Sequence, residues 1–237
     1  MMRNLIQSVI ALGVSILAGA TSASGAGSGA QCNPRRPASP AEALSELLAG
    51  NARWASGKPI HPGLDASRRH CVFVEGQTPF AAILSCSDSR VPSEYIFDQG
   101  VGDLFVVRTA GNSSDTLEEQ SLGYAAEVLH VPIIMVMGHQ SCGAVAGAVD
   151  AYPAKAPLFL SVIYDAVKQA REVITRRGGN PDDKSALARQ TIDRHVILEV
   201  RKLAETHPFK EMIAAGKLKI VGGRYDLDSG RVVMLTQ

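Results

Sequence analysis

Two short stretches of the chain combine thiols, an imidazole and charged groups in the way that a metal centre requires. The first is Cys86-Ser87-Asp88-Ser89-Arg90, and the second is Gly138-His139-Gln140-Ser141-Cys142-Gly143. Two thiolates and one imidazole suit zinc, and three protein ligands leave a fourth position for water or another group. His139 and Cys142 are three residues apart, so one turn can bring both onto the same ion. We therefore expect Cys86, His139 and Cys142 to bind one zinc ion.

Each stretch alone also has an ordinary structural explanation. A single buried cysteine usually behaves as a small, inert hydrophobic residue, and a single histidine more often caps a helix than binds a metal. The two stretches, however, both follow apolar runs that are typical of buried strands. Together, at equivalent strand ends, they favour a metal centre over two unrelated structural roles.

Asp88 and Arg90 follow Cys86 at two and four residues. Their simplest interpretation is a structural salt bridge. In a catalytic interpretation, Asp88 either becomes the fourth metal ligand in a closed state or pairs with Arg90 and leaves that position open. A neighbouring cation favours the ionised carboxylate, so the pair would act as a pH-dependent gate. We expect the open state at neutral pH.

The elements that must position these residues alternate along the chain. Ser39-Pro40-Ala41-Glu42 is a capping box that begins a first helix, for which Gly50 is a plausible end. Residues 57–79 are rich in glycine, proline and polar residues and indicate mainly loop. Beyond them, the pattern predicts strands at 80–85, 104–107, 133–137, 218–225 and 232–235, and helices at 116–129, 158–176 and 185–205. This order predicts a three-layer α/β/α fold with a mainly parallel central sheet and a C-terminal antiparallel edge strand.

The composition and the N-terminus restrict the function and the location. The 237 residues have a formal charge of +1, which argues against a nucleic-acid-binding protein. After a basic start, residues 5–20 form an apolar run that is short for a membrane span, and small residues follow it. We therefore predict a signal peptide at about 1–23, a flexible lead-in at 24–38 and a single domain at 39–237. The predicted location is periplasmic or secreted, without a stable membrane anchor.

The two motifs, in this order, resemble those of the β-class carbonic anhydrases. The resemblance runs from about Pro40 to the C-terminal hairpin. It implies zinc held by the two cysteines and the histidine, a catalytic pair of Asp88 and Arg90, and a homodimer or homotetramer in which the first helix packs on a neighbour. The implied reaction is the reversible hydration of carbon dioxide to bicarbonate by a zinc-bound hydroxide, which Asp88 would orient.

Further residues match the substrate pocket of the plant-like branch of this family. Gln77 lies nine residues before Cys86, where that branch has a glutamine that donates to the substrate oxygen. Phe105 and Tyr124 match the aromatic pair of the pocket, and Gly143 follows the last ligand. The resemblance therefore implies that these four residues contact the substrate.

Another branch of the family has an allosteric bicarbonate site, which includes a tryptophan three residues before the first cysteine. This chain has Ile83 at that position, although Arg108 and Tyr225 match other members of the site. A bicarbonate-locked inactive form is therefore not expected.

Several alternatives remain open. The same zinc chemistry would serve the hydrolysis of carbon disulfide or carbonyl sulfide, and a catalytically silent zinc protein is a further possibility. Cys32 and Cys71 lie outside the metal set and either form a disulfide, as an exported chain permits, or remain unpaired. The other histidines are expected at the surface, namely His61, His70, His130, His195 and His207.

Overall fold

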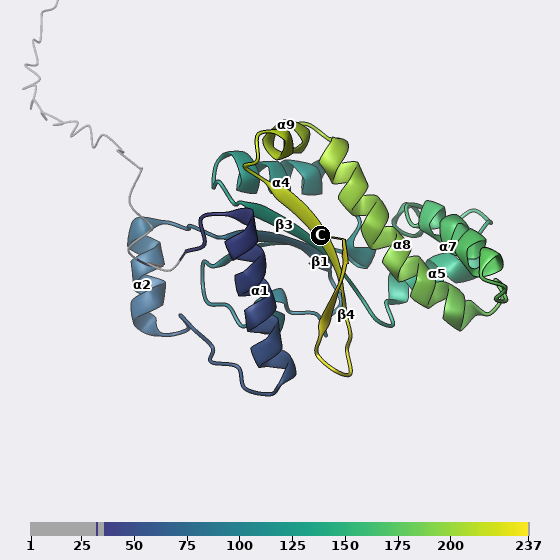
Figure 1. The fold of residues 1–237 in the computed structure, drawn as a ribbon, viewed down its shortest axis with the longest axis horizontal. Coiled ribbons are helices and arrows are strands. Elements are labelled where there is room, and N and C mark those ends of the chain that lie inside the picture. Colours follow the sequence, from purple (N-terminus) through teal and green to yellow (C-terminus); the bar gives the residue numbers. More distant parts are fainter. Residues whose placement is uncertain (1–31, 33–35, 237) are drawn as a thin grey trace, which may run out of the picture.

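The computed structural model describes residue 32 and residues 36–236 (Figure 1). The predicted signal peptide and most of the predicted lead-in lie outside the described residues. Within the described part of the chain, no helix combines the length and the apolar character needed to cross a membrane.

A five-stranded sheet forms the centre of the molecule. Its strands are β1 (Ala81–Cys86), β2 (Leu104–Thr109), β3 (Ile133–His139), β4 (Lys219–Tyr225) and β5 (Val232–Thr236). They lie in the order β2-β1-β3-β4-β5, and the pairings are parallel except that of β4 with β5. The two strands that carry the metal motifs, β1 and β3, are therefore direct neighbours in the middle of the sheet. This confirms the predicted mainly parallel sheet with an antiparallel C-terminal edge strand.

Helices cover both faces of the sheet and form the outer layers of the fold (Figure 1). Alternate residues of the central strands face opposite sides, because side chains along a strand alternate between faces. Ala82, Leu84 and Val136 face a cluster with α4, α8 and α9, whereas Ile83 and Met135 face a cluster with α1 and α3. The helices of these layers are α1 (Pro40–Ala55), α3 (Ser93–Ile96), α4 (Thr116–Glu127), α8 (Lys184–Glu205) and α9 (Phe209–Ala214).

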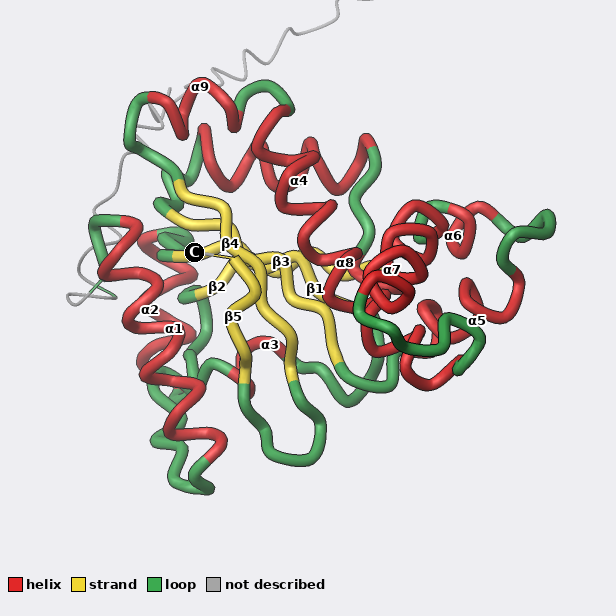
Figure 2. The backbone as a smooth tube through the Cα atoms, turned by 45° about the vertical axis from the view of Figure 1, so that its right-hand side comes forward, coloured by secondary structure: helices red, strands yellow, loops and turns green. Residues whose placement is uncertain are grey.

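A third group of helices packs at one end of the sheet (Figure 2). It comprises α5 (Gly143–Ala151), α6 (Leu158–Ser161) and α7 (Tyr164–Arg176), which pack with part of α8. Cys86 and Cys142 belong to the apolar cluster that these helices form. The metal motifs thus lie where the central strands meet this group of helices.

The prediction that the first helix ends at Gly50 is wrong, because α1 continues to Ala55. Gly50 is a packing residue. A Cβ atom built on it would lie 1.8 Å from the carbonyl oxygen of Phe97, so any larger residue would displace that segment. Glycine stands here because another part of the backbone approaches closely, which the local sequence does not reveal.

The interpretation of residues 57–79 as mainly loop is incomplete: residues 57–65 and 76–79 are loop and turns, but helix α2 (Ala66–Glu75) lies between them. The Asp65 side chain caps its first turn by accepting a hydrogen bond from the Arg68 backbone N–H. The helix has no buried residue, so a core-facing apolar stripe does not mark it in the sequence. It is held by a disulfide between Cys32 and Cys71 and by an ion pair between Arg68 and Asp103.

Candidate metal centre

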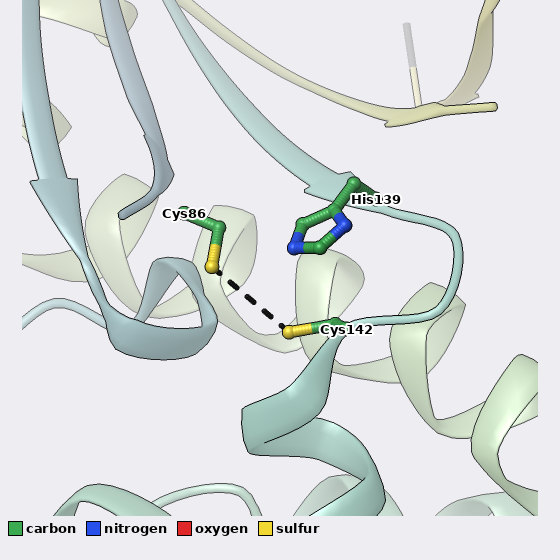
Figure 3. Close-up of side chains that lie close together, drawn as sticks. All are labelled: Cys86, His139 and Cys142. Carbon is green, nitrogen blue, oxygen red and sulfur yellow. Dashed lines mark hydrogen bonds between the residues drawn. The ribbon is translucent and has the colours of Figure 1, made fainter. Parts of the chain in front are cut away.

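The three predicted ligands lie at the ends of elements that the core fixes in place. Cys86 is the last residue of β1 and His139 the last of β3, while Cys142 caps the N-terminus of α5. Between the last two, Ser141 adopts a left-handed conformation with a φ of 56°. Such a φ is uncommon outside glycine and turns the chain sharply. The turn returns the chain so that Cys142 faces His139 (Figure 3).

The three side chains converge into one buried cluster. Their ligand atoms all lie within 4.8 Å of one another, and the two sulfur atoms are 4.0 Å apart. The residues are 5%, 0% and 3% exposed in chain order. Three potential metal donors that meet without a solvating shell are the arrangement expected of a prepared metal centre rather than of surface residues.

The imidazole of His139 is oriented for a metal. Its Nδ1 lies 2.9 Å from the carbonyl oxygen of Gln140, so Nδ1 carries the proton and donates it. The other nitrogen, Nε2, is buried and has no hydrogen-bond partner among the described residues. A buried polar atom without a partner is costly, and a zinc ion would satisfy it. Backbone carbonyls commonly fix metal-binding histidines in this tautomer.

Even without a metal, the site favours one ionised and one protonated cysteine. A hydrogen bond from Cys142 lowers the pKa of Cys86, and the backbone N–H of Gly111 adds to the effect. The pKa of Cys142 is raised, because its thiol is held protonated by the hydrogen bond to Cys86, because it is buried, and because ionising it would place a second negative charge beside the first. A divalent cation removes this conflict, because it stabilises both thiolates together. The donor set therefore fits zinc.

Asp88 lies beside the cluster and is held by Arg90. The Arg90 guanidinium donates to both carboxylate oxygens of Asp88, at 2.9 and 2.7 Å, and the Arg90 backbone N–H donates at 2.9 Å. These bonds hold the pKa of Asp88 well below its usual range. The carboxylate is thus ionised at neutral pH, and its nearer oxygen lies 3.9 Å from Nε2 of His139. Arg90 also donates to the carbonyl oxygen of Ser141, which links the two motifs.

One contact to the cluster was missed in the sequence. The backbone N–H of Gly111 donates to the sulfur of Cys86 over 3.3 Å. Gly111 lies in a short 3-10 helix, η2 (Ala110–Asn112), that follows β2, and it has a φ of 79°. The Gly-Asn pair one residue after the strand was the available signal, since these residues accept left-handed backbone most readily.

The predicted substrate residues lie in two places. Gly143 is beside the cluster, and a Cβ atom on it would meet nothing within 4 Å, so it borders open space. Gln77 instead precedes β1 and lies at the opposite end of that strand from Cys86. Phe105 and Tyr124 contact each other, with ring centroids 6.2 Å apart, and Phe105 pairs in register with Ala82 rather than with Cys86. Within one protomer these three residues are therefore not brought to the metal cluster.

The residues that match the allosteric site of the family are engaged in other contacts. The Arg108 side chain donates to the carbonyl oxygens of Cys86 and Asp88, at 3.0 and 2.6 Å. The hydroxyl of Tyr225 accepts a hydrogen bond from the Trp54 indole at 3.1 Å. Arg108 thus supports the backbone of the first motif, and Trp54 is a packing residue of α1.

The sequence of the chain matches a known protein family. The family model described as carbonic anhydrase matches residues 81–232. "Carbonic anhydrase 2" of Mycobacterium tuberculosis is 41% identical over 197 residues, which cover 82% of this chain and 92% of that protein. A carbonic anhydrase of Mycolicibacterium smegmatis is 37% identical, with 81% and 92% covered.

Solved structures give the same result. A tetrameric β-carbonic anhydrase of Sordaria macrospora superposes with a TM-score of 0.61 at 26% identity, covering 81% of this chain and 96% of that one. The β-carbonic anhydrase of Coccomyxa, in complex with acetazolamide, gives a TM-score of 0.63 at 25% identity, with 81% and 86% covered. Sequence, fold and donor set agree: the chain belongs to the β-class carbonic anhydrases, which are zinc enzymes that hydrate carbon dioxide.

Proposed function

We propose that the enzyme hydrates carbon dioxide at a zinc ion bound by Cys86, His139 and Cys142, with Asp88 and Arg90 as its catalytic pair. One observation carries this assignment. The unpartnered Nε2 of His139 meets two buried thiols directly beside a carboxylate that Arg90 keeps ionised. A purely structural zinc would need neither the carboxylate nor the arginine.

Asp88, Arg90 and Gly143 each have a separate role beside the zinc site. When bound, zinc supplies a Lewis acid that activates water as a nucleophile near neutral pH. Asp88 would accept a hydrogen bond from the attacking water and so orient that water toward the substrate. Arg90 holds the carboxylate in this position and keeps it from becoming a fourth ligand. Gly143 leaves room for the small, uncharged substrate next to the cluster.

We further propose that a second copy of the chain completes the substrate pocket. Gln77, Phe105 and Tyr124 lie away from the cluster of their own protomer, and Tyr124 is 46% exposed. The β-carbonic anhydrases of Sordaria macrospora are tetrameric. A homodimer or homotetramer could place these three residues of one protomer at the zinc of its neighbour.

Mixed assemblies test this arrangement. Cys142→Ala removes a zinc ligand and Gln77→Ala removes the donor, so each homo-oligomer is expected to be poorly active. Co-expression of the two variants with different tags would create a site that has zinc from one subunit and Gln77 from the other. Activity near half that of the wild type supports a shared site. Mixed assemblies that are no more active than the parents would show that Gln77 acts within its own protomer or not at all.

The location is a separate proposal. We infer export to the periplasm or the medium from the predicted signal peptide at 1–23, and the disulfide between Cys32 and Cys71 is consistent with an oxidising compartment. Fractionation of cells, followed by N-terminal sequencing of the mature protein, tests the location and identifies the cleavage site. An uncleaved chain in the cytoplasm would contradict the proposal.

Zinc analysis coupled to stopped-flow hydration of carbon dioxide across pH tests the function. We expect one zinc per chain and activity that rises between pH 7 and 9. Sulfide release from carbonyl sulfide or carbon disulfide, measured on the same sample, tests the alternative hydrolase. Protein with full zinc and no hydration in this pH range would refute the proposed function.

A further inference from the structure

His195 is buried, contrary to its predicted surface position. It lies on α8 and is 2% exposed, whereas the other four histidines outside the metal centre are exposed. Its polar neighbours in the sequence suggested a solvated helix face. The structure instead turns His195 and Glu199, one helical turn apart, toward the interior. Burying an ionisable side chain is costly unless it forms hydrogen bonds or ion pairs. The groups that bind His195 and Glu199 therefore indicate the role of these residues.

The partners of this face all belong to the loop that follows β2. The Ser113 hydroxyl lies 3.0 Å from Nε2 of His195. Ser114 donates to Glu199 twice, from its hydroxyl at 2.6 Å and from its backbone N–H at 3.1 Å.

Lys202, on the next turn of α8, donates to the carbonyl oxygen of Ser114 at 2.6 Å and pairs with Glu119 at 2.9 Å. We call His195, Glu199 and Lys202 the α8 anchor. The anchor therefore contacts the loop at two consecutive residues, Ser113 and Ser114, which follow Gly111 and Asn112.

The loop makes a tight left-handed turn between β2 and the residues that the anchor contacts. Gly111 and Asn112 both have left-handed backbone, with φ of 79° and 51°. A Cβ atom on Gly111 would lie 3.0 Å from Ile163, so the turn is also tightly enclosed. Left-handed backbone is uncommon for a residue other than glycine, such as Asn112, and the hydrogen bonds of the α8 anchor to Ser113 and Ser114 hold the chain directly after it.

The supported loop contacts the metal centre directly, since the Gly111 N–H donates to the Cys86 sulfur. A hydrogen bond to a thiolate withdraws charge from a metal ligand, and such outer contacts commonly tune a metal site. Two thiolates donate more negative charge to zinc than imidazoles would, and this weakens the Lewis acidity of the zinc ion. The Gly111 N–H opposes that effect at one of the two sulfurs.

We propose that His195 and Glu199 are positioning residues that hold the Gly111 N–H on the Cys86 thiolate and thereby tune the bound zinc. Neither residue touches the cluster, and both act through the loop. The pKa of His195 is lowered to about 4, mainly by burial, so the imidazole is neutral at physiological pH and can accept from Ser113. The inference rests on the proposed zinc site but not on the identity of the substrate.

Substitution of 113Cd for zinc in the full-length protein provides a direct test. In the wild type we expect scalar coupling between the metal and the Gly111 amide proton, transmitted through the N–H···S contact. His195→Ala and Glu199→Ala should abolish or reduce this coupling and weaken zinc binding by about ten-fold or more, as measured by chelator competition. Glu199→Gln retains an acceptor for Ser114 and should retain both properties.

Leu203→Ala is the matched control. Leu203 is buried on the same helix, two turns after His195, and packs in the core cluster with α4 and α9. It should lower stability while leaving the coupling and the zinc affinity unchanged. Equal zinc loss in this control, or folded His195→Ala and Glu199→Ala proteins with wild-type coupling and affinity, would overturn the inference.

Ser113→Ala covers the case in which the α8 variants do not fold, because it removes only the loop hydroxyl. A reduced coupling supports the inference, and an unchanged coupling overturns it. These readouts need no substrate. A protein that shows the coupling but does not hydrate carbon dioxide would therefore refute the proposed function and leave the positioning role intact.

Discussion

The metal centre and helix α2 differ in what keeps them in place. The ligand side chains project from the two central strands and from α5, and each is almost completely buried. Helix α2 has no buried residue and is attached by the Cys32–Cys71 disulfide and by the ion pair of Arg68 with Asp103. Apolar burial stabilises the first region, and a covalent bond with a few polar contacts stabilises the second.

This difference indicates that the two regions should respond to different perturbations. A reductant breaks the Cys32–Cys71 disulfide that attaches α2 but leaves the packing around the metal centre unchanged. Acid, or the loss of a ligand side chain, weakens zinc binding at the metal centre but leaves the disulfide intact. Variants that separate these responses test whether the two regions are independent.

The largest effect is expected from Cys142→Ala. Loss of one of three protein ligands should leave the protein nearly free of zinc and reduce hydration to the uncatalysed level, because the cluster then offers only two donors. Metal analysis after dialysis, together with a hydration assay, measures both. The disulfide of α2 should persist, as shown by a thiol count. Full zinc in this variant would mean that Cys142 is not a ligand.

Asp88→Ala should keep zinc and lose activity by about 100-fold, the range typical of a positioned proton-accepting group. Arg90 then has no carboxylate to hold, but the three ligands are intact. Zinc content and kcat are compared with those of the wild type. Zinc loss as large as that in Cys142→Ala would instead make Asp88 a permanent ligand.

Cys71→Ser tests the other region. It should lower the free energy of unfolding by about 2–4 kcal/mol, the usual contribution of one disulfide, while zinc content stays at one per chain. Denaturant unfolding and metal analysis check the two parts. Cys32→Ser is the matched control and should give the same loss. A thiol count of four in denatured, unreduced, metal-free wild type would contradict the disulfide.

A smaller effect on stability is expected at acidic pH, where His195 becomes protonated. Its folded pKa of about 4 lies below its ordinary value of 6.5, so between these values the unfolded chain binds a proton that the folded chain does not. Stability should therefore fall as the pH drops from 6.5 to 4. His195→Gln should remove about 2 kcal/mol of that fall. Unfolding at saturating zinc and several pH values measures the difference, and equal slopes in both proteins would refute it.

The sequence predicted the sheet well because its signals are local. Buried apolar runs located β1, β2 and β3 within two residues at each end, and their order implied a parallel sheet. The same runs placed the candidate ligands at strand ends. These predictions depend on what the neighbouring residues are, which a single sequence contains.

The failures depend on contacts between distant residues. Gly50 was mistaken for a helix end because its close approach to Phe97 is visible only in the folded chain. His195 was assigned to the surface because nothing in the sequence of α8 shows that the distant Ser113 is its hydrogen-bond partner. The substrate role of Gln77, Phe105 and Tyr124 stays a prediction, because a second copy of the chain would be needed to bring them to a metal cluster. Helix α2 was missed because it buries nothing.

The order of strands in the sheet has a consequence for folding. Cys86 and His139 are separated by 53 residues, which include β2 and α4, yet they end neighbouring central strands. Zinc can engage all three ligands only after this long-range pairing has formed, so the ion binds the native chain far better than the unfolded one. By mass action, the free zinc concentration then adds to the stability of the protein. Where zinc is scarce, the same sequence would be a less stable protein.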